Sequence, residues 1–193
     1  IKYDLIMGNP PYYVMKKKDV DNKYYKYFDG RPNIFILFII KAIEMLNDNG
    51  ILSFVLPKSF INCLYYDKTR SYINSEFTII NIIECQGKYM DTRQETIIMI
   101  IQKKIPTSGA NSQFIMTRNN YTIFGIPDNI KNINLLYNGS KSLSNLGFKV
   151  NVGNVVWNQC KDILTDDAKK TRLIYNSDIS YNRLIDPPKK YNN

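Results

Sequence analysis

The chain has 193 residues, of which 44% are hydrophobic, enough to bury the core of one domain and part of a second. Its 26 Lys and Arg against 17 Asp and Glu give a net charge of +9, which favours a polyanionic partner such as DNA over an acidic surface or a neutral one. The Lys, Ile, Asn and Tyr content is also the bias expected from an A/T-rich genome, so charge is supporting evidence only.

Targeting and cross-linking signals are weak. Three widely spaced cysteines, Cys63, Cys85 and Cys160, suggest neither a disulfide framework nor a zinc cluster, so no metal is expected. The longest apolar run, Ile34 to Ile40, is much shorter than the roughly 20 residues that span a bilayer. No secretion signal is visible. A cytoplasmic, DNA-associated location is therefore predicted.

The first predicted element is a short buried strand over residues 3 to 7, followed by the rigid loop Asn9-Pro10-Pro11-Tyr12. Two consecutive prolines fix φ at about −65° and remove two backbone donors. Asn9 is kept out of the α region by the proline that follows it. Because ligands of open α/β sheets bind beyond the carboxyl ends of strands, this loop predicts a pocket.

The loop suits the activation of an amine. An amine conjugated to a ring or a carbonyl is a poor nucleophile until acceptors on its N–H bonds pull the nitrogen towards tetrahedral geometry. The Asn9 side-chain oxygen and the Pro10 carbonyl are candidate acceptors, and Tyr12 can stack on a flat substrate. No general base is needed, so the absence of histidine is no obstacle. The alternative is a proline turn that only ends a strand.

A hydrophobic strand followed by Asn-Pro-Pro-Tyr resembles the catalytic motif of amino-methyltransferases that use S-adenosylmethionine, especially the adenine-N6 DNA methyltransferases. The resemblance implies catalytic roles for Asn9, Pro10, Pro11 and Tyr12. It also implies that the target adenine is flipped out of the duplex.

Residues 13 to 32 are polar and basic and predict a loop. Lys16, Lys17 and Lys18 precede a run from Lys23 to Tyr27 in which lysines and tyrosines are interleaved. Such a run can follow a nucleic-acid strand by ionic contact and stacking. A solvated loop that orders only on substrate binding is an equally good interpretation.

Asn33 is a suitable N-cap for a mostly buried helix whose apolar face runs from Phe35 to Leu46. Asn47 to Gly50 predicts its end, and residues 51 to 56 form an apolar run typical of an inner parallel strand. With Pro57-x-x-Phe60, this order resembles the stretch after the catalytic motif in Taq-like, gamma-class adenine methyltransferases.

A further helix is predicted over residues 64 to 75, with Lys68 and Arg70 on its polar side. Strands are predicted over 77 to 84 and 95 to 102, and the short link between them permits an antiparallel hairpin but no helical crossover. In the family that the chain resembles, an aromatic residue on this link forms the second face of the adenine pocket. The resemblance places that role at Tyr89, with Met90 as the alternative.

Residues 103 to 110 predict a linker, and no strong helix is expected beyond it. The sequence there shows short β-like runs at 113–117, 121–124, 148–152, 154–157 and 172–175. Residues 143 to 179 resemble the start of the target-recognition domain of Taq-like methyltransferases, which implies that a hairpin over 149–157, with Lys149, and Lys161 face the duplex.

The predicted fold is α/β. Residues 1–105 are expected to form the C-terminal half of a Rossmann-like methyltransferase sheet, and residues 106–193 an irregular β-rich domain that is part of a target-recognition domain. In the family that the chain resembles, a glycine-rich loop and an acidic residue ahead of the Asn-Pro-Pro-Tyr strand hold the cofactor, and no Gly-x-Gly occurs in this chain. The half that binds S-adenosylmethionine is therefore expected to be absent from residues 1–105, with another chain as one source of it, and cofactor binding by this chain alone should be weak.

The function predicted is site-specific methylation of adenine N6 in double-stranded DNA, as in restriction-modification systems. Protein glutamine-N5 methylation is an alternative, because release-factor methyltransferases share the tetrapeptide, although they have no appended recognition domain. A non-catalytic DNA-specificity module and cytosine amino-methylation are further alternatives.

Overall fold

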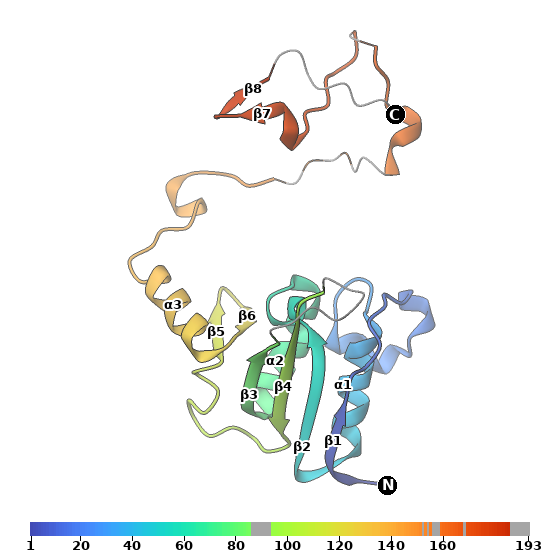
Figure 1. The fold of residues 1–193 in the computed structure, drawn as a ribbon, viewed down its shortest axis with the longest axis vertical. Helices are drawn as coiled ribbons and strands as arrows, with labels where there is room; N and C mark the ends of the chain where they lie inside the picture. The colour runs from blue at the N-terminus through green and yellow to red at the C-terminus, as the bar shows by residue number, and fades with distance from the viewer. Residues whose placement is uncertain (86–93, 152, 154, 156–158, 168, 186–193) are drawn as a thin grey trace. The chain divides into compact units, whose positions relative to one another are not determined.

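The computed structural model describes residues 1–85, 94–151, 153, 155, 159–167 and 169–185 (Figure 1). The chain divides into two compact units, Ile1–Ser140 and Lys141–Asn193. Within the described ranges, no helix combines the length and the apolar character needed to cross a membrane.

The first unit is built on a four-stranded mixed sheet with the strand order β1-β2-β4-β3 (Figure 1). The strands are β1 (Tyr3–Gly8), β2 (Leu46–Pro57), β3 (Thr78–Glu84) and β4 (Thr96–Gln102). β1 and β2 are parallel, whereas β2 with β4 and β3 with β4 are antiparallel. The predicted inner strand and the predicted antiparallel hairpin are thus confirmed.

β1 forms one edge of this sheet, and its side chains are largely exposed. Leu5 is 52% and Met7 is 70% exposed. The strand predicted over residues 3 to 7 is confirmed, but its predicted burial was wrong. An apolar run predicts the strand itself, but burial also needs a neighbouring strand and a covering layer, and β1 pairs on one side only among the described residues.

Helix α1 (Ile34–Met45) connects the two parallel strands. The Asn33 side chain accepts a hydrogen bond from the Phe35 N–H, as expected of an N-cap. The predicted buried face is confirmed, with Phe35, Ile36 and Ile39 fully buried, but Phe38 is 44% exposed. The expected stop at residues 47 to 50 instead forms the beginning of β2.

The predicted second helix is divided into a 3-10 turn, η4 (Leu64–Tyr66), and α2 (Asp67–Glu76). Arg70, expected on the polar side, is fully buried, so that prediction was wrong. Its guanidinium donates to the carbonyls of Thr122 (2.6 Å), Phe60 (2.8 Å) and Cys63 (2.8 Å) and lies 3.5 Å from the Asp67 carboxylate. These acceptors make burial of the charge possible. Burial lowers the pKa of Arg70, and the neighbouring Tyr121 and Asp67 oppose that shift.

Residues 106–140 belong to the first compact unit, so its limit does not coincide with the boundary predicted at residues 105 and 106. β5 (Ile115–Arg118) and β6 (Tyr121–Phe124) form an antiparallel hairpin where β-like runs were predicted. Phe114 and Phe124 join the core. The hairpin packs there because the Thr122 N–H donates to Asp67 and the Thr122 carbonyl accepts from Arg70.

α3 (Pro127–Tyr137) contradicts the expectation that no strong helix follows the linker. Proline at the first turn favours a helix start. Sequence reasoning missed this helix, although Ile130, Ile133 and Tyr137 have the spacing of one helical face.

The second unit contains only short elements among its described residues: η5 (Ser144–Leu146), η7 (Lys161–Ile163), η8 (Asn176–Asp178), β7 (Ile179–Ser180) and β8 (Arg183–Leu184). The predicted strands at 148–152 and 172–175 and the hairpin over 149–157 are not found at the residues described there. Phe148 and Val150 are 62% and 76% exposed. A segment of alternating polar and apolar residues forms a strand only when it can pair with another strand and pack against a core.

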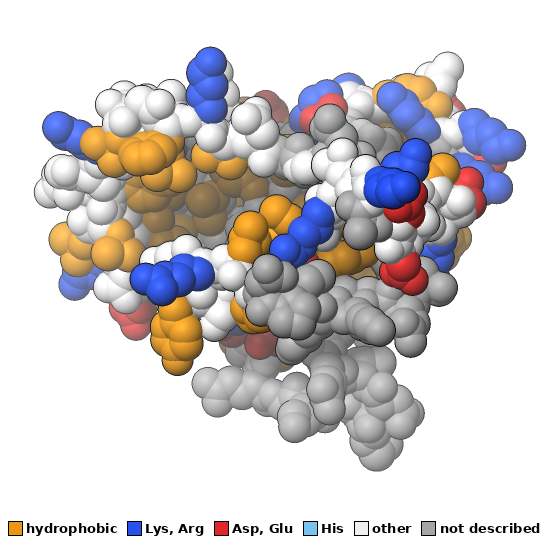
Figure 2. Space-filling model, turned by 90° about the horizontal axis from the view of Figure 1, so that it is seen from above, with side chains coloured by type: hydrophobic (Ala, Val, Ile, Leu, Met, Phe, Trp, Pro, Cys, Tyr) orange, Lys and Arg blue, Asp and Glu red, His pale blue; other side chains and the backbone are white. Residues whose placement is uncertain are grey.

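Basic side chains are interspersed with other kinds of side chain in the space-filling view. Figure 2 shows Lys and Arg spread among hydrophobic and acidic side chains there. The net charge therefore does not by itself locate a DNA-binding surface.

Candidate active site at the end of β1

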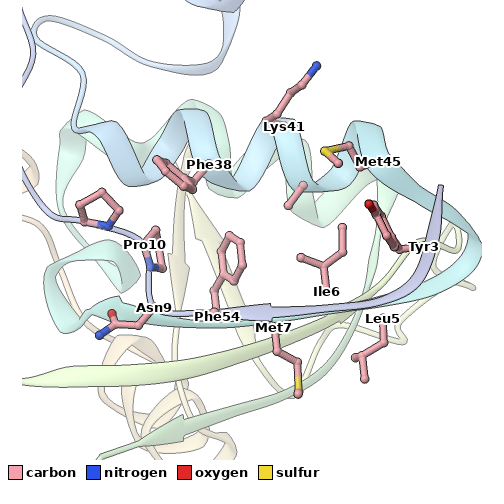
Figure 3. A pocket seen from close by; sticks show the side chains of 13 residues that line it. Tyr3, Leu5, Ile6, Met7, Asn9, Pro10, Phe38, Lys41, Met45 and Phe54 are labelled. Atoms are coloured by element: carbon pink, nitrogen blue, oxygen red, sulfur yellow. The ribbon is translucent and has the colours of Figure 1, made fainter. Parts of the chain in front are cut away.

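The loop Asn9 to Tyr12 follows the carboxyl end of β1, the position expected for a ligand site in a sheet of this kind (Figure 3). Pro10 is buried and fixes the loop against the unit, whereas Asn9 is exposed. The chain thus presents an amide side chain to solvent from a backbone that two prolines hold in place.

Both the hydroxyl group and the ring of Tyr12 are held in place. Its hydroxyl oxygen lies 2.7 Å from Asn9 Oδ1 and 2.8 Å from the Val55 carbonyl oxygen, and it can donate to either. Its ring meets Phe35 edge to face, with 6.0 Å between ring centroids. The hydrogen bond to Val55 joins the loop to β2, which the sequence did not indicate. The predicted stacking of Tyr12 on a substrate stays a prediction.

A buried aromatic cluster supports the loop from below. Phe35 packs on Phe60 (5.9 Å between centroids) and on Tyr66 (5.0 Å), and Phe60 packs on Phe124 (6.1 Å). Phe60 is fully buried, so the Pro57-x-x-Phe60 motif supplies core rather than a surface that a substrate can contact. Burial also raises the pKa of Tyr66.

A pocket of about 560 Å³ opens between β1 and α1, beside Asn9 and Pro10 (Figure 3). Its walls are mainly apolar, with Ile6, Phe38 and Phe54 turned into it and Lys41 on α1. None of the described lining residues is acidic. The ribose and methionine groups of S-adenosylmethionine need hydrogen-bonding and charged partners, so the residues present do not fit those groups.

A second pocket, of about 520 Å³, lies at the carboxyl end of β2 and is lined by Lys58, Asn62 and Glu95 among others. The Lys58 ammonium lies 3.1 Å from Glu84 and 3.3 Å from Glu95, and it therefore ties the ends of β2, β3 and β4 together. The hydrogen bond to Glu84 raises the pKa of Lys58. Sequence reasoning missed this residue, whose only signal is its place directly after a predicted strand.

The basic segment after the loop contains regular structure. It contains the 3-10 turns η1 (Lys17–Asp19) and η2 (Asn22–Tyr27), and the buried side chains of Val20 and Phe28 anchor it. The prediction of a plain loop was thus incomplete. Three ammonium groups lie over tyrosine rings at 4.6 to 5.0 Å from the ring centroids: Lys17 over Tyr25, Lys23 over Tyr24 and Lys26 over Tyr27.

The other predicted site residues are spread over the chain. Lys16, Lys17 and Lys18 are exposed in the first unit, and Lys149 and Lys161 are exposed in the second. Tyr89 and its alternative Met90 lie outside the described residues. Contact of these residues with DNA or with a base stays a prediction.

Comparison with known proteins points to one group of enzymes. Residues 1–90 match the family described as Eco57I restriction-modification methylase. The type II methyltransferase M.CvrRI of Paramecium bursaria Chlorella virus XZ-6E is 28% identical over 157 residues, which cover 79% of this chain and 39% of that protein. The modification methylase CviBIII of Paramecium bursaria Chlorella virus NC1A is 33% identical over 110 residues, covering 56% and 28%.

Among solved structures, a putative class I S-adenosylmethionine-dependent methyltransferase from Listeria monocytogenes matches 53% of this chain and 32% of its own, with 17% identity and a TM-score of 0.48. The chain spans 39% or less of the two curated relatives described above. The chain is therefore similar, most clearly over its first 90 residues, to type II restriction-modification methyltransferases.

Proposed function

We propose that this chain carries the amine-activating loop of a site-specific DNA adenine-N6 methyltransferase that uses S-adenosylmethionine. The observation that carries the proposal is the loop at the carboxyl end of β1, where the exposed carboxamide of Asn9 stands beside the Pro10 peptide within the segment that matches restriction-modification methylases. That match favours a nucleic-acid substrate over the glutamine of a release factor.

The proposed chemistry depends on two acceptors. Asn9 Oδ1 and the Pro10 carbonyl oxygen each accept one N–H of the adenine amine, which draws the nitrogen lone pair out of conjugation with the ring. Pro10 and Pro11 have no N–H, so the loop offers few donors that would compete for these oxygens. When bound, S-adenosylmethionine would supply the methyl group as an electrophile. The described residues that line the pocket beside Asn9 do not fit its polar groups, so we propose that another part of the protein would hold it.

Adenine in a duplex cannot reach this loop, so the base must be flipped out at a cost of about a few kcal/mol. Stacking on Tyr12 and on Tyr89 is proposed to offset that cost. Lys16, Lys17 and Lys18 and, in the second unit, Lys149 and Lys161 are the proposed phosphate contacts.

The edge of β1 with which no described strand pairs is the proposed attachment point of the cofactor-binding half, in the same protein or on another chain. Leu5 and Met7 point away from α1 (Figure 3), and on β3 the exposed Ile80 and Ile83 alternate with buried residues. Apolar strand faces and a free strand edge are rarely left bare in soluble proteins. A further strand parallel to β1 would pair with its free edge, and a helix attached to that strand would cover the apolar strand faces.

The test uses the protein that carries this chain, duplex DNA and S-adenosylmethionine labelled in the methyl group. We expect the label in N6-methyladenine after digestion of the DNA to nucleosides. Label in N4-methylcytosine, or in a glutamine of a protein substrate, would contradict adenine specificity. Duplex binding without any methyl transfer would support the non-catalytic module instead.

A matched pair of variants locates the activity. Asn9→Ala should abolish methylation and leave duplex binding nearly unchanged, because Asn9 is proposed to act on the flipped amine and not on phosphate. Asn9→Asp keeps an acceptor and should retain more activity than Asn9→Ala. Asn132→Ala, an exposed asparagine on α3, is the control and should change neither property.

A further inference from the structure

We infer that the hydroxyl group of Tyr12 is a positioning group that sets the direction of the Asn9 carboxamide, a role separate from any stacking by the tyrosine ring. The inference rests on the proposed function, because it assigns Asn9 Oδ1 as the acceptor of the substrate amine. It concerns the hydrogen bond between the Tyr12 hydroxyl and Asn9 Oδ1.

The geometry places one donor between two acceptors. The Tyr12 hydroxyl oxygen is 2.7 Å from Asn9 Oδ1 and 2.8 Å from the Val55 carbonyl oxygen. Pairing between β1 and β2 ends at Gly8 opposite Phe54, so the phenol reaches the carbonyl of the residue that follows the last pair. Val55 lies in β2, between β1 and β4, and its carbonyl is therefore a fixed reference point.

The ring that carries this hydroxyl is also fixed. Phe35 is fully buried and meets the Tyr12 ring edge to face, and the prolines hold the backbone on the other side. By contrast, the carboxamide torsion of an exposed asparagine is broad unless a hydrogen bond holds it. The Tyr12 hydroxyl supplies that bond, so the orientation of the Asn9 side chain is fixed relative to the sheet.

Asn9 Oδ1 and the Val55 carbonyl oxygen are both within reach of the phenolic proton. Donation to Asn9 Oδ1 leaves that oxygen a second lone pair for another donor. When the substrate amine donates to Oδ1, the O–H bond rotates towards the Val55 carbonyl and leaves Asn9 to the substrate. No covalent bond breaks and no heavy atom needs to move. The Tyr12 hydroxyl therefore orients the acceptor before the substrate arrives and does not compete with it afterwards.

The test compares Tyr12→Phe with the parent enzyme, since phenylalanine keeps the ring and removes only the hydroxyl. The single-turnover methylation rate should fall about tenfold, equivalent to about 1.4 kcal/mol. Capture of the flipped base, followed with a fluorescent adenine analogue at the target position, should stay within about twofold because the ring is retained. Tyr65→Phe, at a tyrosine that is 57% exposed, is the matched control and should leave the rate unchanged.

A second measurement does not depend on activity. In proton-nitrogen correlation spectra of this chain, the Asn9 side-chain amide signals, assigned with Asn9→Ala, should shift and exchange faster with water in Tyr12→Phe but not in Tyr65→Phe. Unchanged amide signals, or a Tyr12→Phe rate equal to the parent rate, would overturn the inference. A parent enzyme that methylates no adenine would instead refute the proposed function, and the amide signals would still decide whether Tyr12 orients Asn9.

Discussion

Replacing Arg70 should reveal how the β5–β6 hairpin is fastened to the sheet. Arg70→Met keeps most of the side-chain volume, so the change removes hydrogen bonds without opening a large cavity. The buried guanidinium donates to the carbonyls of Thr122, Phe60 and Cys63 at 2.6 to 2.8 Å. All three lose a charged donor at once, and the Asp67 carboxylate loses its cation at 3.5 Å.

The expected loss in the free energy of unfolding is about 3–5 kcal/mol, the usual cost of removing one partner from a buried charged network. That is a large share of the roughly 5–15 kcal/mol that stabilises a typical domain. Arg70→Lys should recover only part of the loss, because an ammonium cannot match the planar fork that reaches carbonyls on separate segments.

Urea unfolding followed by circular dichroism measures this loss, and hydrogen exchange locates it. The Thr122 amide, which donates to Asp67 at 2.8 Å, should exchange faster in Arg70→Met. Arg118→Met, at an exposed arginine on β5, is the control and should change stability by less than about 0.5 kcal/mol. A loss below about 1 kcal/mol in Arg70→Met would show that the buried network does not hold the hairpin.

Three further predictions concern single interactions. Duplex affinity should fall steeply as the salt concentration rises. Replacing Lys16 to Lys18 with glutamine should reduce the slope of log affinity against log salt concentration by roughly 0.9 for each phosphate that is no longer neutralised. Salt-independent binding would contradict an ionic role for these lysines. Burial, aided by Tyr27, raises the pKa of Tyr72 to about 12. As the pH rises, Tyr72 ionises first in the unfolded chain, so the stability that its raised pKa contributes is present below about pH 10 and is lost as the pH rises towards 12. Ultraviolet titration of the parent and of Tyr72→Phe measures this pKa. A Tyr72 titration near pH 10 would contradict the prediction. Asn111→Ala should cost about 1–3 kcal/mol in thermal unfolding, because buried Asn111 accepts from the Ile79 N–H (2.8 Å) and donates to the Phe77 carbonyl (2.9 Å); an unchanged melting temperature would contradict this.

The elements that are determined by residues close together in the sequence could be predicted from the sequence. Asn33 and the apolar spacing after it specify α1, and the β-branched runs specify β3 and β4. The short link between those strands leaves an antiparallel hairpin as the only pairing. The loop from Asn9 to Tyr12 is likewise local, because prolines fix the backbone whatever surrounds it. The sequence by itself thus determined the place and the backbone of the loop that is proposed to activate an amine.

Contacts between distant parts of the chain decided the rest. Arg70 is buried because Thr122, 52 positions further along the chain, supplies an acceptor for its guanidinium. No local sequence pattern distinguishes such an arginine from a solvated one. β1 is exposed because no described strand lies on its outer side. The Tyr12 hydroxyl reaches Val55, 43 positions away, only after β1 and β2 have paired. The direction of the Asn9 side chain is therefore a property of the folded sheet, since its reference point exists only there.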